Sequence, residues 1–344
     1  MSDTQPHIVF LYQYFSIKEY YIPHPLWHYL VYITSLIFSI SIEYSAVISS
    51  SALVTLWTYL VYSIAGKTLK IPQYLLVLIT FSIIIMGPLN LPWYNIIIYM
   101  GQGSPNIWHN VTLWTVKPFA LLTMFYILLA ITEKKNTYYI FTTIFLTLSL
   151  FAKPSFVIMF LPALFIFAFI KKIKDTQFKI FFLILSFISI AVLAYQFTHT
   201  FHNGDSKVIF DFLGVWSEKS QNIAYSILLA LAFPLLFLLL ESKIIHENAI
   251  LLSWLQVGMG LILYSSFAQT GKYYAHANFS WSYMIAMSLL YLFSIIKFFA
   301  LYHVMNKLKR YLLLVLLSIQ ISIGIYYFLK MLQGQSPLWI AIFI

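Results

Sequence analysis

Residues 134–175 read KKNTYYIFTTIFLTLSLFAKPSFVIMFLPALFIFAFIKKIKD, and their pattern predicts two consecutive membrane-spanning helices. Two apolar segments, 137–152 and 154–170, are separated by Lys153 and Pro154 and flanked on both sides by lysines. An apolar segment of about 20 residues is long enough to cross the hydrocarbon of a membrane as a helix. Because lysine-rich loops stay in the cytoplasm, the turn at Lys153 is expected on the outer face.

Apolar segments recur through the chain, which has 344 residues, 61% of them hydrophobic and only 9% charged. With a mean hydropathy of +0.86, this composition is typical of a polytopic membrane protein. The sequence therefore predicts an all-α, polytopic helical membrane protein, with about ten spanning helices that form one domain over residues 44–344. The expected spans are 44–66, 72–90, 113–132, 137–152, 154–170, 178–196, 222–241, 248–269, 278–300 and 311–330.

The basic residues alternate from loop to loop, so each second connection is expected in the cytoplasm. The formal charge of +10 is spread over these short loops without forming a basic stripe, which favours contacts with lipid headgroups over nucleic-acid binding. No cysteine is present, which excludes disulfides and thiolate chemistry. The expected cytoplasmic connections are near Lys67, at Lys134 and Lys135, at 171–179, at Lys243 and at 307–310; the expected external ones are 91–112, the Lys153 turn, 197–221 and 270–277.

Residues 1–43 are expected to form an external, amphipathic juxtamembrane segment. The stretch 27–42 follows Pro23 and Pro25 and is short for a full span. Residues 7–21 place aromatic and polar side chains on opposite sides of a helix, as in a helix that lies in the membrane interface. We favour two juxtamembrane helices on the outer face; the alternative is an ordinary spanning helix with a cytoplasmic N-terminus.

Charged and titratable residues expected on the outer face are candidates for catalysis. Asp3, which precedes His7, His24 and His28 in the chain, could act as a general base if a substrate hydroxyl reaches it. The dipeptides Lys117-Pro118 and Lys153-Pro154 place lysines on the outer side, against the charge rule, which indicates an anionic ligand such as a lipid-linked phosphate. The simpler alternatives are an exposed terminal carboxylate and lysines that snorkel to phospholipid headgroups.

The external loop GQGSPNIWHN is suited to carbohydrate, because amide and imidazole groups lie beside an aromatic face. Its candidate sugar-binding residues are Asn106, Trp108, His109 and Asn110. The alternative is that the polar residues cap the next helix and that the tryptophan lies in the aromatic belt.

The later external loops add further candidates. The spacing of His199, His202 and Asp205 could hold a divalent metal, but such clusters in polar loops are more often solvated, so no metal ligand is predicted. Lys272 and His276, in GKYYAHANF, are candidates for acceptor binding, as is His28.

These residues resemble the pattern of the GT-C superfamily of integral-membrane glycosyltransferases, such as protein O-mannosyltransferases and aminoarabinose transferases. In that family an acidic residue of the first external loop is followed by an H-P or K-P dipeptide at the start of a juxtamembrane helix, which Asp3 and His24-Pro25 match. Basic residues at later outer helix ends hold the donor phosphate, and Lys153 in LFAKPSFVIMFLPALF looks like one of them. The resemblance covers the first half of the chain and fades after residue 180. Family members begin with a spanning helix and carry an acidic pair, whereas this sequence shows one early acidic residue and no spanning helix before it. The resemblance therefore leads us to expect a misplaced start at Met1 or a truncation that removes the first helix.

The resemblance implies an enzyme that transfers a sugar from a polyprenyl-phosphate donor to a glycan, lipid or protein acceptor. The setting would be the bacterial cytoplasmic membrane, with the active face outward and polysaccharide or cell-envelope biosynthesis as the context. Asp3 would deprotonate or orient the acceptor hydroxyl in an inverting transfer, while Lys153, Lys117 and His24 bind the donor phosphate. The chemistry requires no cofactor, although a divalent cation is compatible with it.

Two alternatives come from other classes of membrane protein. A polysaccharide polymerase or ligase usually carries arginines in two large external loops, whereas Arg310 is the only arginine and lies in an expected cytoplasmic loop. A lipid-linked-sugar flippase or transporter would more often show charged residues near mid-membrane and helices broken at matching places in two halves. Pro234 and the stretch 258–260 are isolated interruptions, so the sequence favours the transferase.

Overall fold

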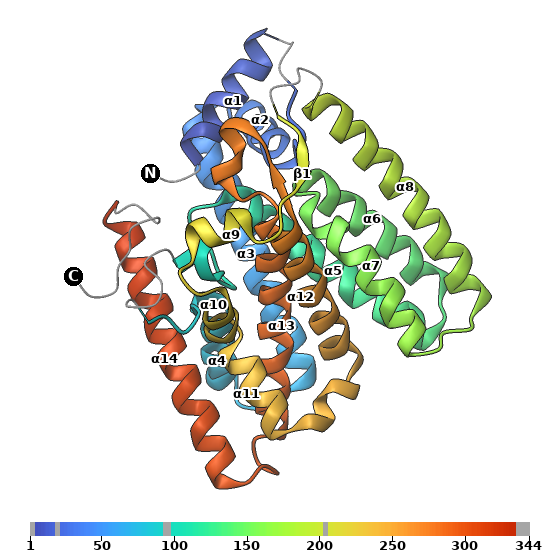
Figure 1. The fold of residues 1–344 in the computed structure, drawn as a ribbon, viewed down its shortest axis with the longest axis vertical. Helices are drawn as coiled ribbons and strands as arrows, with labels where there is room; N and C mark the ends of the chain where they lie inside the picture. Colours follow the sequence, from blue (N-terminus) through green and yellow to red (C-terminus); the bar gives the residue numbers. More distant parts are fainter. Residues whose placement is uncertain (1–3, 18–20, 92–97, 202–205, 335–344) are drawn as a thin grey trace.

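The computed structural model describes residues 4–17, 21–91, 98–201 and 206–334. Within them the chain forms a helical bundle with a two-stranded antiparallel sheet, in which β1 (Val208–Phe210) pairs with β2 (Phe267–Gln269) (Figure 1). Long apolar helices of this kind confirm the predicted helical, multi-pass membrane protein. Six described helices are long and apolar enough to cross a membrane: α3 (Ile42–Thr68), α5 (Val111–Glu133), α8 (Thr176–Thr200), α12 (Asn248–Ser266), α13 (Ser280–Leu301) and α14 (Lys307–Leu332).

The ten apolar segments expected from the sequence all contain helix, but they differ in length. The pair α10 (Ile223–Ala230) and α11 (Ala232–Leu240) is bent by 71° and would make a seventh span if it crosses as one unit. By length the described chain therefore has six or seven candidate spans, and the predicted number of ten is not confirmed. The shorter α-helices are α1 (Thr4–Ile17), α2 (Leu26–Phe38), α4 (Gln73–Ile85), α6 (Asn136–Ala152), α7 (Ser155–Ile170) and α9 (Gly214–Lys219). A short π-helix, η1 (Ile98–Gln102), and two short 3-10 helices, η2 (Ser242–His246) and η3 (Gly271–His276), complete the described elements.

The bend between α10 and α11 follows from Pro234, near the start of α11. Proline has no amide hydrogen, so the carbonyl of Ala230, four residues earlier, loses its helical partner. Tyr291 of α13 donates its hydroxyl to this carbonyl (2.7 Å) and accepts a bond from the side-chain amide of Gln320 on α14 (2.8 Å). The freed backbone group is thus satisfied inside the bundle, as an apolar environment requires.

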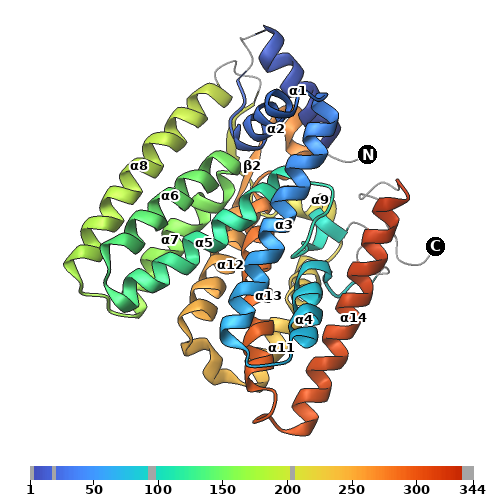
Figure 2. The ribbon, with the colours of Figure 1, turned by 180° about the vertical axis from the view of Figure 1, so that it is seen from behind.

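The centre of the bundle and its edge differ in burial. Helix α13 is buried along almost its whole length, as expected for a helix that is apolar on every face. Helix α8 lies at the edge of the bundle in both views (Figures 1 and 2), and its Leu183 and Phe187 are 68% and 75% exposed. In a membrane protein such side chains face lipid, so α8 is accessible from the bilayer.

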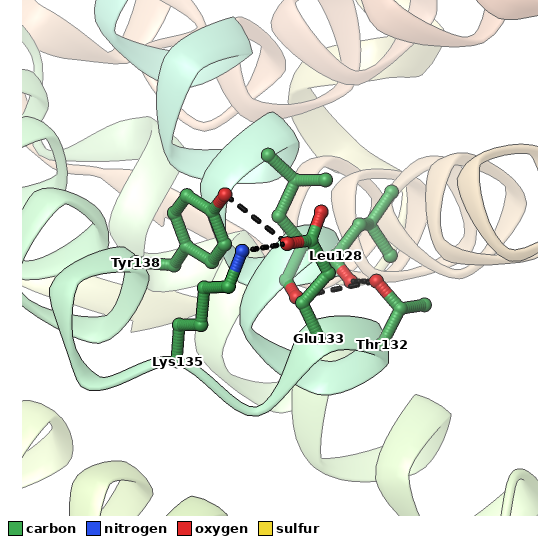
Figure 3. A network of polar contacts seen from close by, with 6 residues as sticks. Leu128, Thr132, Glu133, Lys135 and Tyr138 are labelled. Atoms are coloured by element: carbon green, nitrogen blue, oxygen red, sulfur yellow. Dashed lines mark hydrogen bonds and ion pairs between the residues drawn. The ribbon is translucent and has the colours of Figure 1, made fainter.

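The two ends of the bundle differ in charge. The connections α3–α4, α5–α6, α7–α8, α11–α12 and α13–α14 all lie toward the lower end in Figures 1 and 2, and they are the connections that the sequence makes basic. In the α5–α6 turn, Glu133 accepts hydrogen bonds from Lys135 (2.7 Å) and Tyr138 (3.2 Å) (Figure 3). Helices α1 and α2 lie at the opposite end, which is the arrangement expected for juxtamembrane helices on the other side of the membrane from the basic loops.

Candidate functional site

Two dipeptides that end in proline come together at the upper end of the bundle. Pro25 stands directly before α2 and Pro154 directly before α7. Proline suits the start of a helix and keeps the residue before it out of helical conformation. Lys153 accordingly has an extended φ of −166° where α6 ends. His24 and Lys153 are thus held at helix ends.

Three histidines gather beside Lys153, and we call these four residues the lysine–histidine cluster. His7 of α1 and His28 of α2 place their Nδ1 and Nε2 atoms 3.2 Å apart. The ring centroids of His7 and His24 are 6.3 Å apart, and the charge of Lys153 acts on both of these rings. The cluster therefore joins α1, the start of α2 and the α6–α7 turn.

Lys153 is buried and oriented by groups from two other helices. Its Nζ donates a hydrogen bond to the hydroxyl of Thr112 on α5 (2.8 Å) and lies 4.5 Å from the ring centroid of Trp281 on α13. The side chain is only 6% exposed. A cation fixed in this way keeps its position when an anion binds, which strengthens electrostatic stabilisation.

The histidines of the cluster are held in the neutral form. Burial, followed by the charges of His28 and Lys153, lowers the pKa of His7 to about 3. Burial lowers the pKa of His28 to about 4, although its contact with the carbonyl of His24 acts in the opposite direction. Burial and then Lys153 also lower the pKa of His24 well below its usual value. Neutral imidazoles can donate hydrogen bonds to an anion without adding like charge beside Lys153.

A groove of about 420 Å³ lies next to the cluster, between the α1–α2 connection, the end of α6 and the end of α8. Pro23 and Pro25, the neighbours of His24, line it, as does Phe151, two residues before Lys153. The volume is within the range of small-molecule sites. Its other lining residues include Tyr14, Tyr21, Tyr29, Tyr195 and Gln196.

Gln196 is a groove residue that could not be selected from the sequence. It is 4% exposed, and neither its amide nitrogen nor its amide oxygen has a hydrogen-bond partner in the described residues. A single glutamine near the end of an apolar helix carries no sequence signal. It becomes a candidate only in the folded structure, because its buried amide lacks hydrogen-bond partners and lies beside a groove.

The second predicted phosphate ligand, Lys117, is placed in a different environment. Its side chain is fully buried, and its Nζ donates to Asn106 Oδ1 (2.8 Å) and to the carbonyl of Pro105 (3.0 Å). The amide of Asn106 in turn donates to the carbonyls of Ile83 (2.9 Å) and Met86 (3.0 Å). This geometry gives Lys117 and Asn106 a structural role, which is to hold the end of α4 against α5. It lends no support to phosphate binding by Lys117 or to sugar binding by Asn106.

The other candidates of the 101–110 loop are also engaged by the protein. Asn110 caps α5, accepting a hydrogen bond from the backbone amide of Leu113 (2.8 Å), which is the capping alternative considered for this loop. His109 is buried with its Nδ1 3.0 Å from the hydroxyl of Tyr327 on α14. Trp108 packs on the ring of Trp114 at 4.5 Å. Trp108 and His109 thus lie against α14, whereas Asn110 approaches the lysine–histidine cluster: it accepts a hydrogen bond from the hydroxyl of Thr112 (2.9 Å), and that hydroxyl accepts the bond from Lys153.

The remaining candidates do not join the cluster in the described structure. The β1–β2 sheet brings the loops 197–221 and 270–277 together, and Tyr274 donates to Asp211 across them (2.7 Å). His276 is exposed and packs on Tyr273. In the part of the chain that is described, no group of three His, Asp or Glu residues could hold a metal ion. Asp3, His202, Asn203, Asp205 and the side chain of Lys272 lie outside the described residues.

Comparison with protein-family models, curated protein sequences and solved structures gives no match. The function is therefore inferred from the sequence and the geometry of this chain.

Proposed function

We propose that the protein is a glycosyltransferase that takes a sugar from a polyprenyl-phosphate donor at the outer face of the bacterial cytoplasmic membrane. The acceptor would be a cell-surface glycan, lipid or protein. The observation that supports this most is the position of Lys153, a buried cation among neutral histidines, next to a groove of about 420 Å³. The exposed apolar face of α8 gives a membrane-bound donor a path to that groove.

In this proposal the acceptor oxygen attacks the anomeric carbon of the donor sugar. The bond between that carbon and the phosphate oxygen breaks, and its electron pair leaves with the phosphate. The ammonium of Lys153 and the N–H groups of the neighbouring imidazoles stabilise the departing charge in a site of low dielectric constant. The acceptor proton passes to a base, a role for which Asp3 remains the sequence-based candidate.

The two ends of the bundle support the proposed orientation. The basic connections lie at the end opposite to α1 and α2, and the positive-inside rule would place those connections in the cytoplasm. The groove and Lys153 would then face outward, where acceptors for a cell-surface glycan are found.

The proposal is tested by following donor consumption in lipid nanodiscs with a panel of polyprenyl-phosphate sugars. Lys153→Ala should lower the rate by about a hundredfold or more, because a fixed charge at the leaving group is lost. Lys207→Ala is the matched control, since Lys207 is exposed and precedes β1 at the same end of the molecule. Consumption of no donor by the folded wild-type protein, or equal rates for wild type and Lys153→Ala, would refute the proposal.

A second candidate, a flippase or transporter of lipid-linked sugars, is favoured by one observation. The chain leaves helical geometry after α4, and in this segment the amide of Leu89 donates to the carbonyl of Leu229 (3.2 Å) at the bent α10–α11 pair. Transporters often build their sites from such broken helices. Movement of a fluorescent lipid-linked sugar between the leaflets of vesicles, without consumption of any donor, would favour this candidate.

A further inference from the structure

The groove beside the lysine–histidine cluster combines aromatic faces with one unsatisfied amide. Tyr21, Tyr29, Phe151 and Tyr195 line it, and none of these side chains is charged. Gln196, on the penultimate turn of α8, is the buried polar residue of the lining. Aromatic faces with a few well-placed hydrogen-bonding groups are what a pyranose ring requires, because its C–H faces are apolar and its edges carry hydroxyls.

The unsatisfied amide of Gln196 indicates which kind of ligand the groove would bind. Both polar atoms of its amide lack a partner within the described residues, although the side chain is nearly inaccessible. A purely hydrocarbon ligand, such as the isoprenoid chain of a carrier lipid, offers this amide no hydrogen-bond partner and would leave it unpaired, which is unfavourable. A sugar can satisfy both atoms, since each hydroxyl both donates and accepts.

The hydroxyl groups of the tyrosines are arranged consistently with such a ligand. Those of Tyr14 and Tyr29, which both line the groove, lie 2.8 Å apart. On the other side, the rings of Tyr21 and Tyr195 both pack on His199, with centroid distances of 5.0 and 4.1 Å. The aromatic walls are thus supported from outside the groove, which limits the entropy that is lost when a ligand binds.

We propose that this groove is the sugar subsite of the protein, in which Gln196 hydrogen-bonds the ring hydroxyls and the tyrosines contact the ring faces. This assignment rests on the proposed function, because it places the sugar of the donor next to the phosphate held at Lys153. It replaces Asn106 and Asn110, which are committed to hydrogen bonds within the protein, as the amides that bind sugar.

The test measures binding in nanodiscs of two probes, a polyprenyl-phosphate hexose and the same polyprenyl phosphate without sugar. Gln196→Leu should weaken binding of the glycosylated lipid about tenfold or more and leave binding of the bare lipid unchanged, since only the sugar uses the amide. The variant should fold, because leucine removes an unsatisfied buried amide. Gln256→Leu is the matched control, since Gln256 is equally buried on α12 and lies against Met124 rather than in the groove.

The results that would overturn the sugar subsite differ from those that would overturn the proposed function. Equal weakening of both probes by Gln196→Leu would show that the groove holds the carrier chain and would overturn the assignment, as would unchanged binding of both. If the wild-type protein binds neither lipid, the proposed function fails, and the subsite is tested with a panel of free monosaccharides by saturation-transfer NMR. A signal that Gln196→Leu abolishes and Gln256→Leu retains would support the subsite, and no signal with any sugar would overturn it.

Discussion

Replacing Asn106 by leucine should destabilise the protein strongly without changing substrate affinity. Asn106 is 2% exposed, and its side-chain amide makes three hydrogen bonds, to Lys117 and to the carbonyls of Ile83 and Met86. Leucine has a similar shape but breaks all three, which leaves two carbonyls unsatisfied and a buried ammonium with fewer partners. Hydrogen bonds between helices in membrane proteins contribute about 0.6 to 1.7 kcal/mol each, so the expected loss is about 2–5 kcal/mol.

A double-mutant cycle with Lys117→Met makes the prediction more specific. Lys117→Met alone removes two hydrogen bonds, which lowers stability, but it also removes a buried charge. The loss of stability is therefore partly offset, because the folded protein no longer has to desolvate an ammonium group. Once Asn106 is leucine, the same change also removes an ammonium that lacks one of its acceptors. The double variant should therefore be more stable than additivity predicts, by about 1–2 kcal/mol.

The free energy of unfolding is measured by titration with a denaturing detergent in mixed micelles, together with the midpoint of thermal unfolding. Asn136→Leu is the control, because Asn136 is exposed at the start of α6 and should change stability by less than about 0.5 kcal/mol. Wild-type stability for Asn106→Leu, combined with a weakened affinity for a sugar substrate, would refute the structural role and restore Asn106 as a binding residue.

Two further predictions concern packing and pH. Gly324→Ala should lower the free energy of unfolding by about 2–3 kcal/mol, because a methyl group on α14 would overlap the carbonyl oxygen of Ile85. Gly258→Ala is the control and should be neutral, because its methyl group would meet nothing within 4 Å. Equal unfolding midpoints for the two variants would contradict this prediction. Since the folded-state pKa values of His7 and His28 are depressed to about 3 and 4, stability should be full above the unfolded value of 6.5 and fall as the pH drops toward 4. The midpoint of thermal unfolding, measured from pH 7.5 to 5, should fall less for the His7→Gln/His28→Gln variant than for wild type, and a flat wild-type profile would disprove the expectation.

Part of the architecture could be predicted because it depends on local sequence. Apolar runs such as 137–152 form helices wherever the chain places them, and their ends follow from nearby lysines and prolines. Pro154 starts α7 and leaves Lys153 extended, whatever packs against that turn. The distribution of lysines likewise predicted that five connections share one end of the bundle.

The number of full spans could not be predicted in the same way. The segment 72–90 is mostly apolar, but α4 ends at Ile85, just before Gly87 and Pro88. The chain then makes hydrogen bonds to α14 and α10 through the amides of Gly87 and Leu89. These partners are more than 100 residues away in sequence. An apolar run therefore shows that a segment is buried or lipid-facing, but whether it remains helical depends on which distant groups can satisfy its backbone.

Local sequence was enough to predict a helical membrane protein, its helical segments, the charge asymmetry of the two ends and the positions of Lys153 and His24 at helix starts. Packing between helices, in contrast, brings these two residues close together, pairs Lys117 with Asn106, and leaves Gln196 without a hydrogen-bond partner beside a groove. The physical reason is that helix formation and topology follow from hydrophobicity and charge along the chain. The role of a polar side chain depends instead on which partners from other helices fill its hydrogen bonds.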